Sequence, residues 1–200
     1  QRRCRPGLRS VHVTTRGRLP QHGCVASTAT SPRERSSIAP SHGARAVTRP
    51  PSAEVLAALE ARIDSWLAAQ LAENPVVAAV ERDTESGERR WFVRVRGEQK
   101  DVFTIWLHLD QRTLHYETYV MPAPEENHAA FYEHLLRRNR KLYGAAFAVG
   151  EENAIFLVGQ MANDAVTDDE LDRVLGSLYA WVEQFFRPAM RIGYASRFKG

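Results

Sequence analysis

Apolar and polar residues alternate along the middle of the chain. In the stretch 102–120, every second residue from Phe103 to Leu109 is apolar, and a second, mostly apolar row runs from Leu114 to Val120. A period of two is typical of strands with one buried face. A tight turn between Leu109 and Leu114 makes these two residues oppose each other and places both rows on the same side. We therefore expect an antiparallel pair of strands here.

A third strand is predicted just before this pair, at residues 90–96. Its apolar side runs from Trp91 to Val95. If Arg96 pairs with Val102 across the short intervening loop, this apolar row continues directly into the row of the next strand. Agreement between independently assigned segments favours a meander of consecutive antiparallel strands.

Three helices are predicted from apolar residues that recur at spacings of three and four. Ser52 is suited to cap the first, and Leu71 belongs to its apolar stripe. Leu136 belongs to the stripe of the second. Thr167 opens a capping box at the start of the third, which Pro188 is expected to end because proline interrupts a helix. The predicted spans are Ser52–Asn74, Pro124–Tyr143 and Thr167–Pro188.

Further strands are expected at residues 76–81, 145–149 and 154–160. The predicted order of elements is α-β-β-β-β-α-β-β-α. This order indicates an α+β domain whose helices pack against one mostly antiparallel sheet.

Charge divides the chain into unequal parts. Residues 1–53 hold ten Arg, no Lys and one acid, a formal charge of +9, whereas the remaining 147 residues carry −6. With few large apolar residues, the first segment is expected to be disordered. It can be a basic arm for nucleic acid, a transit peptide, or a translated upstream region before a start near Val47, and we favour the last. We expect a folded domain at residues 54–194 and a short tail at 195–200.

Several classes of function are disfavoured by composition. The acidic domain argues against nucleic acid as a partner, because phosphate binding needs a basic surface. No run approaches the roughly 20 apolar residues of a membrane span. Both cysteines, Cys4 and Cys24, precede the predicted domain, so no cysteine-based metal or disulfide site is expected there. We expect a cytoplasmic protein without a cofactor.

The predicted register also defines the face of the meander opposite the apolar rows. If no helix covers this face, its aromatic and cationic residues are typical of a surface that holds a peptide or another subunit, with Phe92, Arg94, Trp106 and Tyr119 as contacts. If a helix covers it, the face is a second packed layer. Both arrangements are compatible with the sequence. Its three predicted cross-strand rows are Phe92–Trp106–Glu117, Arg94–Thr104–Tyr119 and Arg90–His108–His115.

Evidence for catalytic chemistry is weak. His108 and His115 oppose each other near Glu117, which is sterically compatible with a metal site, but exposed histidines are common on strands. We expect no metal there, because no other run of ligand residues supports the site, and no enzyme, because no nucleophile elbow or phosphate-binding glycine loop occurs.

The apolar side of the last helix is unusually wide. Trp181, Phe185 and Phe186 extend it beyond one face. This pattern indicates either a dimer interface or a helix that is buried on two sides. The cations Arg137–Lys141 near the end of the second helix form either a basic patch or, more commonly, a complement to the helix dipole.

Four segments resemble the YbjN family, which is grouped with the type III secretion chaperones of the CesT type. They are the stretch around Asn139 and Tyr143–Phe147, the strand Ile155–Gln160, the helix start Thr167–Asp172 and the ending Arg187–Tyr194. The resemblance covers roughly residues 54–194. It implies a chaperone-like α+β domain that is often dimeric and binds extended peptide segments, and it supplies no catalytic residues to carry over. We therefore expect a non-enzymatic chaperone-like or regulatory module that acts as a homodimer; the alternative is a self-associating scaffold without a peptide client.

Overall fold

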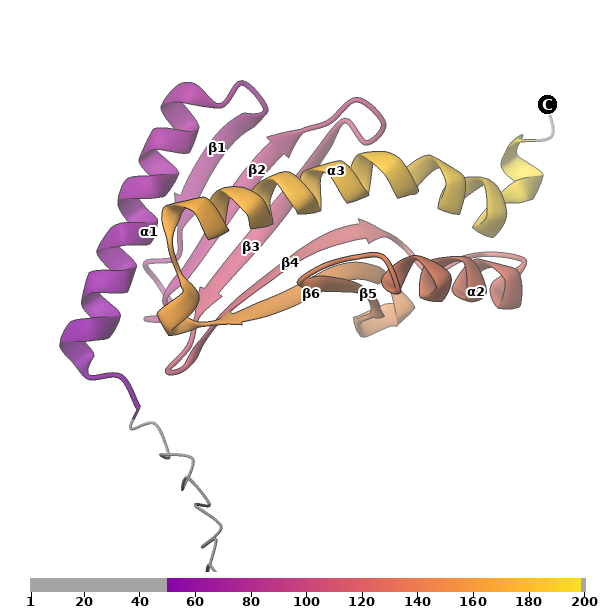
Figure 1. Cartoon of the computed structure of the whole chain (residues 1–200). Helices are drawn as coiled ribbons and strands as arrows, with labels where there is room; N and C mark the ends of the chain where they lie inside the picture. Colours follow the sequence, from indigo (N-terminus) through magenta and orange to yellow (C-terminus); the bar gives the residue numbers. More distant parts are fainter. Residues whose placement is uncertain (1–49, 199–200) are drawn as a thin grey trace, which may run out of the picture. The chain divides into compact units, whose positions relative to one another are not determined.

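The computed structural model describes residues 50–198, which belong to one compact unit. In this part of the chain, three α-helices lie on one face of a six-stranded sheet, whose strand pairs are all antiparallel (Figure 1). The strand order is β1-β2-β3-β4-β6-β5. The predicted α+β class and element order are confirmed, and the predictions for residues 1–49 lie outside the described residues. The elements are α1 Ala53–Glu73, β1 Val77–Arg82, β2 Arg90–Arg96, β3 Val102–Leu109, β4 Thr113–Met121, α2 His128–Asn139, β5 Ala145–Val149, β6 Ile155–Ala162 and α3 Asp168–Gly193, with 3₁₀ turns at Glu151–Asn153, Asn163–Ala165 and Ala195–Phe198.

The register of the meander is the predicted one. Arg96 opposes Val102, and Leu109 opposes Leu114. The apolar rows therefore join into one buried layer across β2, β3 and β4, beneath the helices (Figure 1). The alternation of apolar and polar residues was sufficient to predict this register, because a slip by one residue would turn every apolar side chain of a strand away from the core.

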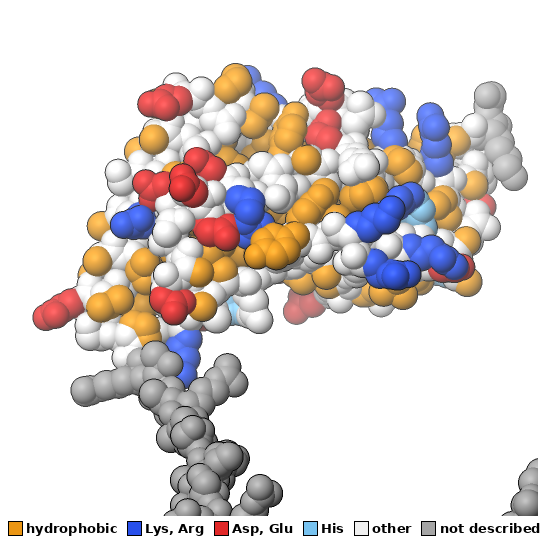
Figure 2. Space-filling view, in the orientation of Figure 1, with side chains coloured by type: hydrophobic (Ala, Val, Ile, Leu, Met, Phe, Trp, Pro, Cys, Tyr) orange, Lys and Arg blue, Asp and Glu red, His pale blue; other side chains and the backbone are white. Residues whose placement is uncertain are grey.

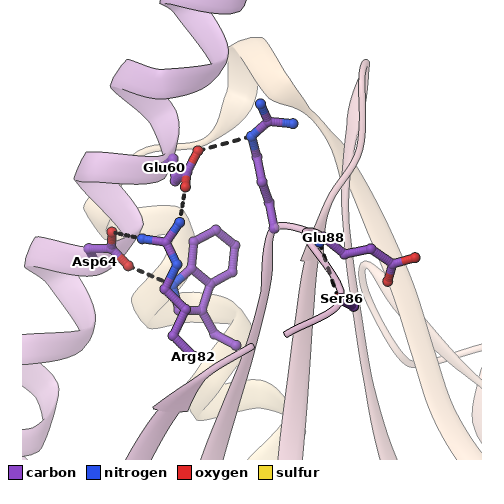
Figure 3. A network of polar contacts seen from close by, with 7 residues as sticks. Glu60, Asp64, Arg82, Ser86 and Glu88 are labelled. Carbon is purple, nitrogen blue, oxygen red and sulfur yellow. Dashed lines mark hydrogen bonds and ion pairs between the residues drawn. The ribbon is translucent and has the colours of Figure 1, made fainter. Parts of the chain in front are cut away.

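Helix α1 is fastened to the β1–β2 hairpin by a polar network (Figure 3). The Trp91 indole N–H donates to Asp64 over 2.6 Å, and the Arg82 guanidinium donates to the other oxygen of Asp64 over the same distance. Arg82 also pairs with Glu60, which accepts a further bond from Arg89 at 2.9 Å. The two helix carboxylates thus hold the hairpin at two successive turns, because residues four apart share one helix face.

Helix α3 continues past Pro188, so the prediction that it ends there was wrong. Proline removes one hydrogen bond within the helix, but tertiary packing holds the turns beyond it. Ala189 is buried, and Gly193 packs directly against the ring of Phe131 on α2. At the other end, Thr167 accepts a bond from the Glu170 N–H, as the predicted capping box requires.

Helix α2 is shorter than predicted at both ends. It begins at His128, after Asn127 in a left-handed conformation with φ 53°. The backbone N–H groups of Glu125 and Glu126 both donate to the carbonyl of Gly193 instead of opening the helix. The position of this helix start thus depends on a residue almost seventy positions away.

The end of α2 is set by Asn139. Its side chain donates to the carbonyl of Phe147 and accepts from the Phe147 N–H, over 3.2 and 2.8 Å. These two bonds cap the free edge of β5 at its middle residue. Leu136 and Leu71, both predicted to be buried, are 65% and 46% exposed.

Candidate functional site

The sheet face opposite the helices is open in the described part of the chain. Figure 1 shows all three helices against the other face. Side chains on the open face are half-buried or exposed, and Trp106 and Tyr119 are each 38% exposed. Of the two arrangements compatible with the sequence, residues 50–198 therefore adopt the uncovered one. We call this surface the outer face.

One row of the outer face crosses all six strands. Phe92 on β2 opposes Trp106 on β3, which opposes Glu117 on β4, as predicted. The row extends to Glu81 on β1 and, on the other side, to Val158 on β6 and its pairing partner on β5. The rings of Phe92 and Trp106 meet edge to face, with centroids 6.2 Å apart, an arrangement that the quadrupoles of aromatic rings favour.

A second aromatic pair lies farther along the same face. Tyr119 opposes Phe156 on β6, and their centroids are 5.5 Å apart at an interplanar angle of 78°. Sequence reasoning missed Phe156, because β6 was not known to be the neighbour of β4. The alternation in β6, where Ile155 and Leu157 are buried, was the signal that places Phe156 on the outer face.

Between the aromatic residues and the β3–β4 turn the outer face is hollowed. The depression measures about 440 Å³, which falls within the range of ligand-binding pockets. We call it the outer-face pocket. Its lining residues are Arg90, Phe92, Trp106, His108, Asp110, His115, Tyr116, Glu117, Val158 and Gly159.

The histidines of the predicted third row face a carboxylate at the turn. The Nε2 atoms of His108 and His115 lie 3.6 and 3.3 Å from the carboxylate of Asp110. Glu117, which the sequence placed near them, has no hydrogen bond or ion pair with either ring. Among residues 50–198 no group of three or more His, Cys, Asp or Glu has an arrangement that could hold a metal ion.

The end of the outer face near Tyr119 is supported by Lys100. The Lys100 ammonium donates to the carbonyls of Tyr119 and Val120 and lies 4.7 Å from the centroid of the Tyr119 ring. The rings of Phe103 and Phe186 lie 5.8 and 5.9 Å away. Such contacts with aromatic faces offset part of the cost of burying a cation.

The loop that carries Lys100 is held by a carboxylate from the helix layer. Glu183 on α3 accepts bonds from the backbone N–H groups of Glu98 and Gln99, each over 2.8 Å, and from that of Lys100 over 3.4 Å. A carboxylate that accepts several backbone bonds fixes a loop strongly. This contact, which no local sequence pattern indicates, links α3 to the β2–β3 loop and so to Tyr119.

Lys100 makes stability depend on pH in a defined window. Burial lowers the pKa of its ammonium from 10.5 to about 8. Between these values the unfolded chain binds more protons at this position than the folded chain, so the free energy of unfolding should rise with pH across the window and fall as the pH drops towards 8. Urea denaturation at several pH values measures this slope.

The variant Lys100→Met isolates the contribution of this one group. Replacement removes the titrating amine while keeping an apolar side chain of similar length, so the rise between pH 8 and 10.5 should be smaller in the variant. If the free energy of unfolding rose equally steeply with pH in the variant and in the unmodified chain, Lys100 would not be the group responsible for the rise.

The helix side of the domain separates its charges. Figure 2 shows Lys and Arg side chains gathered over α2 and acidic side chains nearer α1 and the start of α3. Arg137 pairs with Glu133 one turn earlier, and the Arg138 guanidinium lies 5.4 Å from the centroid of the Phe185 ring. Arg138 therefore packs against the core and Arg137 pairs within the helix. The positive charge of both residues near the end of α2 also complements the helix dipole.

Of the residues predicted to form a dimer interface, Phe185 lies in the core. It is 7% exposed and meets Phe147 on β5 with ring centroids 5.8 Å apart. Trp181 and Phe186 are partly buried against the same core. In the described part of the chain, Phe185 thus fits the alternative of a helix buried on two sides, and the dimer stays a prediction.

Together, the three-helix layer, the six-stranded antiparallel sheet and its open face define a small α+β domain built around an exposed sheet surface. Comparison with known families then identifies it further. Residues 61–189 match the model of the YbjN family, whose description reads "Putative bacterial sensory transduction regulator". The chain belongs to the YbjN family, as the sequence resemblance predicted.

Mycobacterial relatives are similar to the chain over about half of its length. "Uncharacterized protein Rv0487" of Mycobacterium tuberculosis is 39% identical over 104 residues, which cover 52% of this chain and 57% of the relative. "Uncharacterized protein ML2442" of Mycobacterium leprae is 34% identical over 110 residues, which cover 55% and 60%. The chain therefore spans less than two thirds of the length of these relatives.

Several solved structures of protein complexes contain similar chains. One is in the crystal structure of the ExsC–ExsE complex, at 17% identity and a TM-score of 0.47, covering 64% of this chain and 94% of that one. Another is in the HopA1–SchA chaperone–effector complex, at 13% identity and a TM-score of 0.48, covering 68% and 99%. A third is in the complex of the Yersinia pestis type III secretion chaperone SycH with a fragment of YscM2, at 16% identity and a TM-score of 0.42, covering 62% and 96%.

Within residues 50–198, no helix is both long enough and apolar enough to cross a bilayer.

Proposed function

We propose that this protein is a non-enzymatic, chaperone-like or regulatory module that binds an extended segment of a partner protein on its outer face. The observation that carries the proposal is the two open pairs of aromatic side chains, Phe92–Trp106 on β2 and β3 and Tyr119–Phe156 on β4 and β6. Aromatic residues that stay half-exposed on a rigid sheet are the side chains that most often anchor protein interfaces.

The geometry of the outer face favours an extended occupant. Phe92 and Trp106 form one aromatic pair and Tyr119 and Phe156 the other, and the pairs lie in different cross-strand rows. A strand-like segment has side chains at a regular spacing on each side, which allows it to contact both pairs at once. Arg94 is exposed beside its ion pair with Glu81 at 3.6 Å, and the guanidinium donors that this pair leaves free can contact a partner's carbonyl oxygen.

The family agrees with a binding role, since its description refers to a regulator. The pocket also supports binding more than catalysis, because it is lined by aromatic rings and by charges that mostly pair with one another. We place the protein in the cytoplasm, acting as a homodimer on a protein client.

Self-association is the second candidate, and one observation favours it. An apolar groove of about 420 Å³ lies between α2 and the edge strand β5, where Leu136 is 65% and Val149 53% exposed. Apolar surface of this kind is a common place for a second subunit to pack. The groove is lined by Tyr132, Leu135, Leu136, Phe147, Ala148, Val149 and Ile155.

One pull-down experiment separates the two candidates. The full chain is compared, after cross-linking in its native cell, with the double variant Trp106→Ala/Tyr119→Ala and with Leu136→Arg. The outer-face proposal predicts a protein partner that is lost in the double variant and kept in Leu136→Arg. A partner lost only in Leu136→Arg, or recovery of nothing but further copies of the chain, would contradict it.

A further inference from the structure

Glu117 stands out on the outer face because its carboxylate has no partner among the described residues. It lies in the middle of β4, half-buried, between Trp106 on β3 and Val158 on β6. No described residue gives it a hydrogen bond or an ion pair. A carboxylate that is partly removed from water without compensation is unfavourable, and a cation placed beside it restores what it has lost.

The neighbouring cations of the outer face are already paired. Arg90 forms an ion pair with Glu88, and Arg94 lies 3.6 Å from Glu81. The uncommitted charge in the outer-face pocket is therefore negative, and it is centred on Glu117. This sign selects a cationic ligand group.

The aromatic wall of the pocket fits the same kind of ligand. Phe92 and Trp106 meet at 88°, and Trp106 keeps 38% of its surface exposed. The Trp106 indole N–H has no hydrogen bond to another described residue. Tryptophan is the ring that attracts cations most strongly, by about 0.5–2 kcal/mol depending on exposure.

We propose that the outer-face pocket binds an arginine side chain of the partner segment, with Glu117 as its ion-pair partner and Trp106 as the ring on which it stacks. This assignment rests on the proposed function, and it specifies which side chain of the partner segment the outer-face pocket binds. Arginine fits better than lysine because its planar guanidinium can pair with a carboxylate through two parallel bonds while stacking on an aromatic ring. The depression of about 440 Å³ offers room for such a side chain.

Two matched peptides test the proposal on the full chain. Both are blocked pentapeptides of alanine and valine around one central residue, which is arginine in one and its uncharged isostere citrulline in the other. Binding is followed by nuclear magnetic resonance through the indole N–H of Trp106, with peptide up to about 10 mM, a concentration that nearly saturates a site with a dissociation constant near 1 mM. The arginine peptide should bind at least tenfold more tightly than the citrulline peptide.

Two variants in the same cross-strand row provide the comparison. Glu117→Gln should abolish the preference for arginine, whereas Glu81→Gln, which changes a carboxylate already paired with Arg94, should leave it intact. Equal binding of the two peptides, no binding of either, or a preference that survives Glu117→Gln would each overturn the proposal. Equal binding that shifts the Trp106 signal would leave the outer face as a peptide surface, so this failure is distinct from failure of the proposed function.

Discussion

Trp91→Ala is expected to lower the free energy of unfolding by about 3–5 kcal/mol, the usual cost of truncating a buried tryptophan. Trp91 is 1% exposed, opposes Leu107 in the central layer and donates its indole N–H to Asp64 on α1. Alanine would leave a cavity beneath the helices and remove one link between α1 and the hairpin. Urea denaturation followed by circular dichroism measures the change.

Trp106→Ala is the matched control, because this tryptophan lies on the neighbouring strand but on the outer face. Its ring touches Phe92 and is 38% exposed. We expect a loss of about 1 kcal/mol or less, the worth of one aromatic pair at a partly exposed site. A Trp106 variant as unstable as Trp91→Ala would mean that the outer face is packed like the core and is not an open binding surface.

Gly159→Ala is expected to cost about 3 kcal/mol, at the upper end of what overpacking usually costs. A Cβ atom at this position of β6 would lie 2.3 Å from the carbonyl oxygen of Gly144 and 2.3 Å from the Tyr116 ring. Neither can move freely, because the Tyr116 hydroxyl donates to that same carbonyl over 2.7 Å and the ring is buried. Thermal unfolding should show a clearly lower midpoint.

Gly176→Ala in α3 makes the opposite prediction for the same substitution. A Cβ there meets no atom within 4 Å, so the variant should gain about 0.5–1 kcal/mol from the better helix propensity of alanine. If both glycine variants changed stability alike, the close approach of β6 to Tyr116 would not be the cause.

The central meander could be predicted in detail from the sequence. The pairings of Trp91 with Leu107 and of Leu107 with Tyr116 follow from alternation and short loops alone, and the structure has them. The N-caps of α1 at Ser52 and of α3 at Thr167 could also be predicted, because each side chain accepts a bond from a backbone N–H only three residues ahead. Signals of this kind are local, and no distant residue changes their outcome.

The helix ends that depend on distant residues could not be predicted. The local effect of Pro188 is to end a helix, because proline lacks a backbone N–H. The buried Ala189 and the packing of Gly193 against Phe131 nevertheless stabilise the helical turns beyond it. The start of α2 is likewise displaced by the bonds of Glu125 and Glu126 to Gly193. In both cases tertiary contacts outweigh local propensity.

The candidate site was partly predictable. Alternation placed Phe92, Trp106 and Glu117 in one row, but it could not say which face the helices cover, because both faces carry large apolar residues. The sequence could not predict that Glu117 has no ion-pair partner among the described residues, because this depends on which carboxylates pair with Arg90 and Arg94.

Site-specific photo-cross-linking can show directly which surface of the domain meets the partner. A photoreactive amino acid replaces Thr104, which lies on the outer face two residues before the anchor Trp106, in one full chain and Leu136 in the groove beside α2 in the other, and both are activated in the native cell. Binding on the outer face predicts a covalent adduct with another protein from position 104 and none with that protein from position 136. An adduct formed only from position 136, or none from position 104, would contradict the assignment of the outer face as the binding surface.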